Sequence, residues 1–224
     1  MDRVKVAEKS LGRLGWEVVG EPPSDPVVVL IGAPHTSNWD FPLFLWMSWV
    51  KGLEPRFLMK KEAFRGPAGA VLRRLGAIAV DRGAASGLVD ELVALAGSAE
   101  HHFQIVIAPE GTRKAGRYWK SGFYRIAEQA GIPICLGFID AHTRTVGFGP
   151  SFRPSGDLAA DMDRIRAFYA DKQGIHPEKA TAPRLREEDA VADPAPVEPD
   201  AAPVEPDAAP DEPTGPDEAP PASS

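Results

Sequence analysis

Short runs of apolar, largely β-branched residues recur along this chain and alternate with segments of helical character. Three of these runs are Val27–Gly32, Phe103–Ala108 and Ile132–Ile139. Val27–Gly32 is continuous and β-branched, which is typical of a strand buried on both faces, as in a parallel sheet with helices on each side. The alternation continues over about 150 residues. The sequence therefore predicts an α/β fold, with a single domain and a largely parallel central sheet flanked by helices.

Shorter segments complete the expected order of elements. Short strands are predicted at Arg56–Met59 and Ala77–Val80, with an edge strand at Thr143–Phe148. Helices are predicted at Phe41–Val50, Pro67–Leu75, Leu88–Gly97, Gly122–Ala130 and Asp157 to about Lys172. The first of these helices is apolar on nearly every side, which predicts that it is buried, lines an acyl-chain site or faces lipid.

Changes in composition divide the chain into three parts. Residues 1–24 have apolar residues at helical spacing, which predicts an amphipathic helix that lies on a membrane face or packs on its own domain. Residues 25–186 hold the α/β pattern. Residues 187–224 contain twelve acidic residues, ten prolines and no basic residue. Such a segment cannot build a core, so we expect a disordered acidic tail rich in proline and alanine.

The net charge of −7 comes from this tail. Residues 1–186 keep 20 of the 32 acidic residues and all 25 basic residues, so their net charge is about +5. A mildly basic domain suits anionic partners such as phospholipid head groups or a phosphorylated carrier. The sequence has no nucleic-acid-binding motif, so nucleic acid is not an expected partner.

The sequence also bears on the compartment. Cys135 is the single cysteine, which excludes an internal disulfide. The N-terminus lacks the cationic start and apolar core of a secretory signal, and no apolar run approaches the roughly 20 residues that span a bilayer. We therefore expect a cytoplasmic protein that is peripheral on the inner face of the membrane.

A histidine and an aspartate follow the first buried strand, within His35–Asp40. An imidazole titrates near neutral pH, and a nearby carboxylate can orient it and stabilise its charged form. We therefore predict that His35 and Asp40 form a general-base pair. No serine or cysteine nucleophile accompanies them, so the nucleophile is expected to belong to the substrate. A helix N-cap is the alternative role for Asp40.

The segment Glu110, Gly111, Thr112 and Arg113 follows a later buried strand. Gly111 permits a turn that presents backbone N–H groups, and Arg113 offers a planar fork for phosphate. Ligands in open α/β sheets bind beyond the carboxyl ends of the strands. We therefore expect this segment and the His35–Asp40 segment to converge in one cleft.

Other basic residues that follow short strands are candidates for phosphate binding. They are Lys60, Lys61 and Arg82, for which a solvated basic face is the alternative. His101 and His102 are adjacent and would point to opposite sides of a strand. No cluster of acidic, cysteine or histidine residues with metal-ligand spacing accompanies them, so no metal site is expected.

Taken together, these segments resemble the lysophospholipid, or glycerophosphate, acyltransferase family. The resemblance covers about residues 27 to 140 and rests on His35–Asp40, Phe57–Glu62, Gly76–Arg82, Pro109–Arg113, Lys120–Gly122 and Gly131–Ile134, in this order and spacing. Leu136 stands where many members have a second proline. The acidic tail lies outside the resemblance.

The resemblance implies transfer of a fatty acyl group from acyl-CoA or acyl carrier protein to the hydroxyl of a lysophospholipid such as 1-acyl-glycerol-3-phosphate. His35 would be the general base and Asp40 would orient it. Arg113 would hold the acceptor phosphate, Gly111 would shape the turn, and Glu110 would position Arg113 or an acceptor hydroxyl. No metal or bound cofactor is expected, and the membrane surface is the expected peripheral partner.

Three alternatives remain open at this point. In the first alternative, the protein is an acyltransferase whose acceptor is a glycolipid or aminolipid. In the second, the protein is a non-catalytic peripheral lipid-binding protein, although the presence of all four polar site residues argues against it. The third is thioester hydrolysis, in which water replaces the acceptor.

Overall fold

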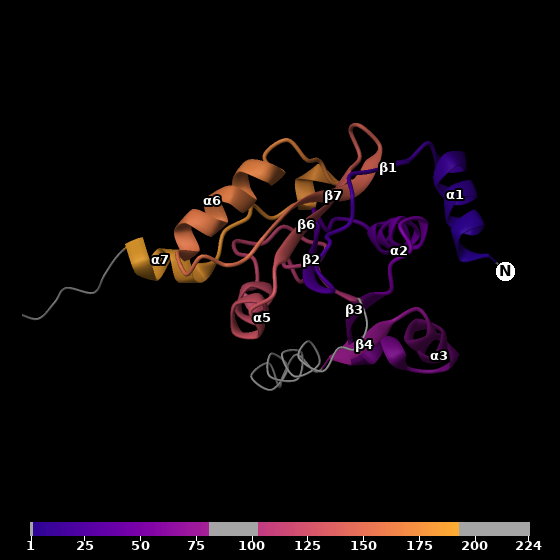
Figure 1. The fold of residues 1–224 in the computed structure, drawn as a ribbon, viewed down its shortest axis with the longest axis horizontal. Coiled ribbons are helices and arrows are strands. Elements are labelled where there is room, and N and C mark those ends of the chain that lie inside the picture. Colours follow the sequence, from indigo (N-terminus) through magenta and orange to yellow (C-terminus); the bar gives the residue numbers. More distant parts are fainter. Residues whose placement is uncertain (1, 81–102, 193–224) are drawn as a thin grey trace, which may run out of the picture. The chain divides into compact units, whose positions relative to one another are not determined.

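The computed structural model describes residues 2–80 and 103–192 (Figure 1). Several predicted features lie outside the described residues. They are the helix at Leu88–Gly97, the residues Arg82, His101 and His102, and the chain beyond residue 192. The elements are α1 (Arg3–Leu14), β1 (Glu17–Val19), β2 (Val27–Ala33), α2 (Asp40–Val50), β3 (Pro55–Lys60), the 3-10 helix η1 (Lys61–Phe64), α3 (Pro67–Arg74), β4 (Ala77–Val80), β5 (Phe103–Ile107), α5 (Gly122–Ala130), β6 (Ile134–Asp140), β7 (Thr145–Phe152), α6 (Leu158–Tyr169), η3 (Pro177–Lys179) and α7 (Arg186–Ala192).

The described strands form one seven-stranded sheet in the order β1-β7-β6-β2-β5-β3-β4. All neighbouring pairs are parallel except β6 and β7. The predicted α/β fold with a largely parallel sheet is therefore confirmed. The prediction of an edge strand at Thr143–Phe148 is wrong, because β1 pairs with β7 on its outer side. The short strand β1 was not predicted.

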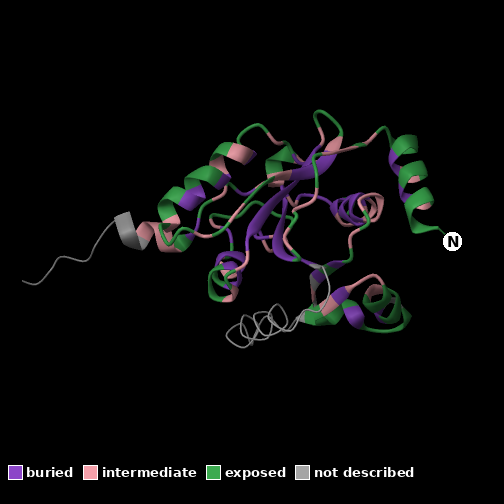
Figure 2. Ribbon diagram, in the orientation of Figure 1, coloured by how far each residue is buried: buried purple, intermediate pink, exposed green. Residues whose placement is uncertain are grey.

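The central strand β2 explains how the core is divided between the two faces of the sheet. All seven of its residues are buried. Side chains alternate across a strand, and Val27, Val29 and Ile31 pack in one core cluster with residues of α5 and α6. Val28 and Leu30 pack in a second cluster with residues of α1 and α2. Figure 2 shows this arrangement as buried strands between helices whose outer faces are exposed.

The helix α1 packs against α2 and buries Ala7 and Leu11. Its ends are well defined, because the Asp2 side chain accepts hydrogen bonds from the N–H groups of Val4 and Lys5, and Gly15 ends the helix in a left-handed conformation. Of the two predicted arrangements for this helix, packing on its own domain is the one observed. No helix among the described residues is long and apolar enough to cross a membrane.

The C-terminal part of the described chain is bound more closely to the domain than the sequence predicted. The first compact unit extends to Ala192, whereas the sequence placed the start of the tail at Glu187. Acidic residues of α7 pair with basic residues elsewhere in the unit: Glu187 with Arg125 at 3.1 Å and Glu188 with Arg166 at 2.6 Å. Negative charge that reads as tail in the sequence is therefore part of the folded unit.

We expect these contacts to contribute measurably to stability. A chain that ends after Arg186 loses the Glu188 carboxylate, which is 12% exposed and also accepts a hydrogen bond from the Leu185 N–H. Such a loss is worth about 1–2 kcal/mol, so the Tm should fall by roughly 3–6 °C relative to a chain that ends after Ala192. Thermal unfolding of the two truncated chains checks this. Equal Tm values would show that α7 does not stabilise the domain.

Candidate active site

His35 and Asp40 are held together at the point where β2 leads into α2. The His35 Nδ1 atom lies 3.1 Å from the Asp40 Oδ2 atom, and the two side chains are 21% and 3% exposed. A proton on Nδ1 therefore points at a carboxylate oxygen, which leaves Nε2 as the basic nitrogen. This is the geometry that orients a histidine for general-base chemistry.

The carboxylate of Asp40 does not serve as an N-cap. Asp40 is the first residue of α2, and its Oδ2 atom accepts hydrogen bonds from the preceding loop, at 2.7 Å from the Thr36 nitrogen and 2.8 Å from the Ser37 nitrogen. These bonds curl the loop so that His35, five residues earlier, reaches the same oxygen. A negative charge at a helix N-terminus is also favoured by the helix dipole.

Two adjacent parallel strands bring the two sequence motifs together. The strands β2 and β5 pair in register, with Ile31 opposite Ile107. His35 follows Ile31 by four residues and Glu110 follows Ile107 by three, so both motifs leave the same edge of the sheet. The expected convergence at the carboxyl ends of the strands is therefore observed.

The side chain of Glu110 braces this junction from within and is only 3% exposed. Its Oε1 atom accepts a hydrogen bond from the His35 backbone N–H, and its Oε2 atom accepts one from the Thr181 N–H at 3.1 Å. Burial raises the pKa of Glu110 to about 7, against the opposing effect of these two hydrogen bonds. Glu110 was expected to position Arg113 or an acceptor hydroxyl, whereas its carboxylate accepts hydrogen bonds from two backbone N–H groups.

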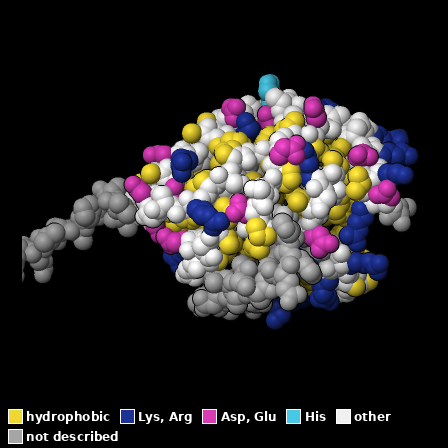
Figure 3. All heavy atoms as spheres, viewed as in Figure 1, with side chains coloured by type: hydrophobic (Ala, Val, Ile, Leu, Met, Phe, Trp, Pro, Cys, Tyr) yellow, Lys and Arg dark blue, Asp and Glu magenta, His cyan; other side chains and the backbone are white. Residues whose placement is uncertain are grey.

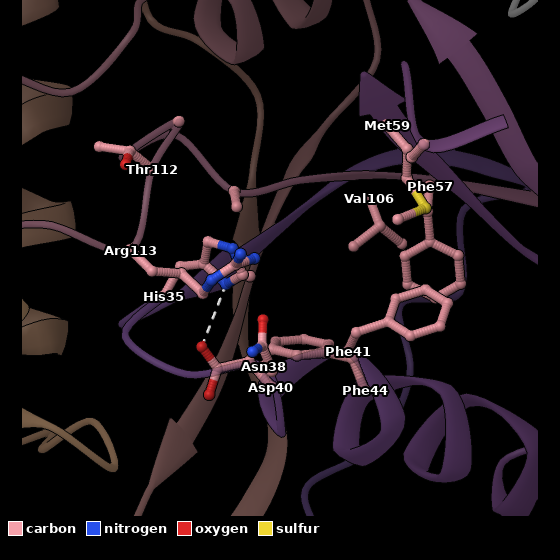
Figure 4. A pocket seen from close by; sticks show the side chains of 14 residues that line it. His35, Asn38, Asp40, Phe41, Phe44, Phe57, Met59, Val106, Thr112 and Arg113 are labelled. Atoms are coloured by element: carbon pink, nitrogen blue, oxygen red, sulfur yellow. Dashed lines mark ion pairs between the residues drawn. The ribbon is translucent and has the colours of Figure 1, made fainter. Parts of the chain in front are cut away.

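A cavity of about 480 Å³ opens beside His35, within the size range of small-molecule sites. Its lining has two chemically distinct sides (Figure 4). The polar side includes His35, Asn38, Asp40, Thr112 and Arg113. The apolar side is formed by Phe41 and Phe44 of α2, Phe57 and Met59 of β3, and Val106 of β5. Such a cavity can hold a ligand that has a polar group at one end and an apolar chain at the other.

The turn after β5 carries the other predicted binding residues to the cavity. Gly111 has a φ of +70°, a left-handed conformation that favours glycine, and its N–H donates to the Ala108 carbonyl. Thr112 and Arg113 are exposed and line the cavity. The structure thus brings Gly111, Thr112 and Arg113 to the same cavity as His35 and Asp40, while Glu110 lies behind it.

Of the other predicted phosphate-binding residues, Lys61 is the one with a described side chain, and it does not belong to the described lining of the cavity. Lys61 is exposed at the start of η1, and Ala63 of the same 3-10 helix lines the cavity instead. Lys60 is the last residue of β3, but nothing is described of its side chain. Arg82 lies outside the described residues.

The apolar wall contributed by β3 was missed by sequence reasoning. Phe57 and Met59 are two residues apart in a strand, so their side chains point to the same face. Phe57 is also in register with Val106 of the neighbouring parallel strand β5, and all three line the cavity. Phe57, Leu58 and Met59 are all apolar, so the sequence of β3 has no alternation that marks one face. What the sequence did not reveal was which face of β3 meets the cavity.

Comparisons with known proteins identify the family. The acyltransferase family model matches residues 17–135, which is more than half of the chain and includes both motifs. No curated protein sequence matches this chain. The crystal structure of the 1-acyl-sn-glycerophosphate (LPA) acyltransferase PlsC from Thermotoga maritima has a similar fold, with a TM-score of 0.52 and 18% identity over 76% of this chain and 75% of that chain. The family match and the shared fold agree with the site, and the chain belongs to the acyltransferase family.

Proposed function

We propose that this protein transfers a fatty acyl group from acyl-CoA or acyl carrier protein to the hydroxyl of a lysophospholipid such as 1-acyl-glycerol-3-phosphate. The observation that carries the proposal is the His35–Asp40 pair on the wall of a cavity that has a polar side, which includes Arg113, and an apolar side. The solved relative from Thermotoga maritima is named as a 1-acyl-sn-glycerophosphate acyltransferase, which supports the same class of acceptor.

In the proposed reaction, the acceptor hydroxyl is the nucleophile. Nε2 of His35 takes the hydroxyl proton as the oxygen attacks the thioester carbonyl, and a new ester C–O bond forms. The C–S bond then breaks, and the departing thiolate takes the proton from Nε2. Asp40 stabilises the imidazolium that exists between these two proton transfers, as a triad aspartate does. No metal or bound cofactor is needed for these reaction steps.

The two sides of the cavity suit the two ends of the proposed acceptor. The Arg113 guanidinium can bind a phosphate through two parallel N–H groups. The aromatic and aliphatic side chains of α2, β3 and β5 can bury part of an acyl chain, which is favourable by about 0.8 kcal/mol for each buried CH₂ group. The acceptor hydroxyl would lie between them, next to His35.

We also propose that the enzyme works from the inner face of a membrane, as a peripheral cytoplasmic protein. Exposed basic residues occur on α1 and on the segment from η1 to α3, namely Arg3, Lys5, Lys9, Arg13, Lys61, Arg65, Arg73 and Arg74. Figure 3 shows Lys and Arg side chains along the right-hand edge, where Figure 1 has these elements. Val71 and Trp39 are exposed large apolar residues, 58% and 54% exposed, and Trp39 directly precedes Asp40. Basic and aromatic side chains together favour an anionic lipid surface.

The direct test is thiol release from palmitoyl-CoA across a panel of lysolipids, with the lipid products identified by mass. Release that requires one acceptor and yields its acylated mass supports the proposal and names the acceptor. Release without any acceptor contradicts it and indicates a hydrolase. If no thiol is released from palmitoyl-CoA or from acylated carrier protein, the result favours a non-catalytic lipid-binding protein.

If His35 is the base, His35→Ala should lower transfer by about 10²- to 10⁴-fold without unfolding the protein. The loss follows because Nε2 of His35 is the atom that accepts the hydroxyl proton in the proposed reaction. Initial rates at saturating substrate check this, with His142→Ala as the control, since His142 is exposed in the turn between β6 and β7. Near-normal transfer by His35→Ala removes this residue from the mechanism.

If Arg113 binds the acceptor phosphate, Arg113→Ala should raise the acceptor KM by at least about tenfold, because a charge-assisted bidentate contact is worth about 1.5–3 kcal/mol. The donor KM should stay within about twofold. The control is Arg117→Ala, which removes an exposed arginine of the same loop that stacks on Tyr118. An acceptor KM that does not change assigns phosphate binding elsewhere or indicates an uncharged acceptor.

Within this proposal Glu110 positions the backbone of His35. Its folded-state pKa of about 7 lies above the ordinary glutamate pKa of 4.5, so between these pH values the folded state binds a proton that the unfolded chain has lost. The associated stability is fully present below about pH 4.5 and is lost as the pH rises through 7.

Glu110→Gln removes this titration, whatever constant cost the amide brings. The Tm of Glu110→Gln relative to wild type should therefore rise between pH 5 and pH 8, by several degrees. Thermal unfolding across this range checks the expectation, with Glu54→Gln as the control at an exposed glutamate. A Tm difference that stays constant with pH shows that Glu110 does not titrate in this window.

A further inference from the structure

A segment far along the chain lies against both site loops. We call residues 174–185 the strap; they lie beyond residues 17–135, which match the family. At its start, a Cβ atom on Gly174 would lie only 2.6 Å from the Thr36 hydroxyl oxygen, and the His176 N–H donates to that oxygen at 3.1 Å. At its end, Leu185 forms an isolated parallel bridge with Trp119. The strap therefore joins the His35 loop to the chain that follows Arg113.

Thr181 is the strap residue that makes the most of these connections. It is 5% exposed, and all three of its hydrogen-bonding groups are used. Its N–H donates to the Glu110 carboxylate at 3.1 Å, its Oγ1 atom accepts from the Gly116 N–H at 2.9 Å, and its carbonyl accepts from the Trp119 indole N–H at 2.8 Å. Thr181 therefore contacts the chain before Arg113 through its backbone N–H, and the chain after Arg113 through its carbonyl and its side chain.

The hydrogen bond from the Gly116 N–H to the Thr181 hydroxyl connects Thr181 to the loop that carries Arg113. The loop that carries Thr112 and Arg113 is exposed from Thr112 to Arg117 and has no helix or strand. It is tied at its start by the Gly111 turn and at its end by the Lys120 N–H, which donates to the Pro109 carbonyl. Within the exposed stretch, the Gly116 N–H bond to Thr181 lies three residues after Arg113.

Such a tether matters because ordering a residue costs about 1–2 kcal/mol of backbone entropy. A loop that is already held in its binding conformation does not meet this cost when the ligand binds, so affinity rises without a new contact to the ligand. Thr181 does not belong to the described lining of the cavity, so it acts through the loop.

We propose that the Thr181 hydroxyl is a positioning group for the acceptor, because it holds the Arg113 loop in the conformation that binds the acceptor's phosphate. The inference rests on the proposed acyltransferase function and extends it to a residue outside the matched family region. The ligand class it serves is a phosphomonoester-bearing lysolipid, and the donor thioester is not affected.

The test replaces Thr181 by valine, which has the same branched shape but no hydroxyl, and by serine, which keeps the hydroxyl. Thr181→Val should raise the KM for 1-acyl-glycerol-3-phosphate about tenfold, while kcat and the palmitoyl-CoA KM stay within about twofold. Thr181→Ser should have an acceptor KM within about twofold of the wild-type value. Thr181→Ala repeats the test without the hydroxyl if the valine chain does not fold.

Tyr124→Phe is the matched control for loss of a buried hydrogen bond. The Tyr124 hydroxyl is 3.0 Å from an Asp161 carboxylate oxygen, and neither residue belongs to the described lining of the cavity. This variant should lose a similar amount of stability with no change in acceptor KM. Hydrogen exchange at the Gly116 amide gives a second readout: it should be faster in Thr181→Val and normal in both Thr181→Ser and Tyr124→Phe.

The outcomes separate this inference from the function on which it rests. A wild type that transfers no acyl group overturns the proposed function, and the acceptor role of Thr181 with it. An active wild type with an unchanged acceptor KM in Thr181→Val overturns only the role of Thr181. A raised KM that serine does not restore also overturns it, because side-chain volume and not the hydroxyl would then be responsible.

Discussion

The buried carboxylate of Glu110 joins three parts of the chain that are far apart in sequence. It accepts one hydrogen bond from the backbone N–H of His35, 75 residues earlier, and one from that of Thr181, 71 residues later. Burial of a carboxylate without a charged partner is costly, and the raised pKa of Glu110 expresses that cost. Because one of these bonds reaches the backbone of His35, this side chain helps to fix the position of His35 relative to the Arg113 loop.

The helix α2 serves both sides of the cavity at once. Its first residue, Asp40, supplies the oxygen that faces His35, and Phe41 and Phe44 in its first two turns supply apolar wall. The helix is nearly free of polar side chains and packs between the sheet and α1, so its position is set by burial. The geometry of the His35–Asp40 pair therefore depends on the packing of a hydrophobic helix, and not on the local loop alone.

Most strands and helices of the described chain were predictable from the sequence, because their signals are local. The continuous apolar run of β2 and the mainly apolar residues of β5 and β6 indicate buried strands, and α2 and α5 have clear boundaries. The strand β1 was missed because three residues carry no period, and its pairing is what removes β7 from the edge of the sheet. The acidic start of α7 was read as tail because its partners, Arg125 and Arg166, lie elsewhere in the chain.

The sequence by itself determined the α/β class, because apolar runs and helical spacing are local signals, and it predicted the pairing of His35 with Asp40 from residue type and short spacing. Only the tertiary structure decided which residues meet the cavity: Phe57 and Met59 do, whereas Lys61 does not belong to its described lining. It also decided that Glu110 braces the backbone and that Thr181 holds the loop. These roles depend on hydrogen bonds and packing contacts between segments that are far apart in the sequence. Such contacts are set by strand order and register, which cannot be read from short stretches of sequence.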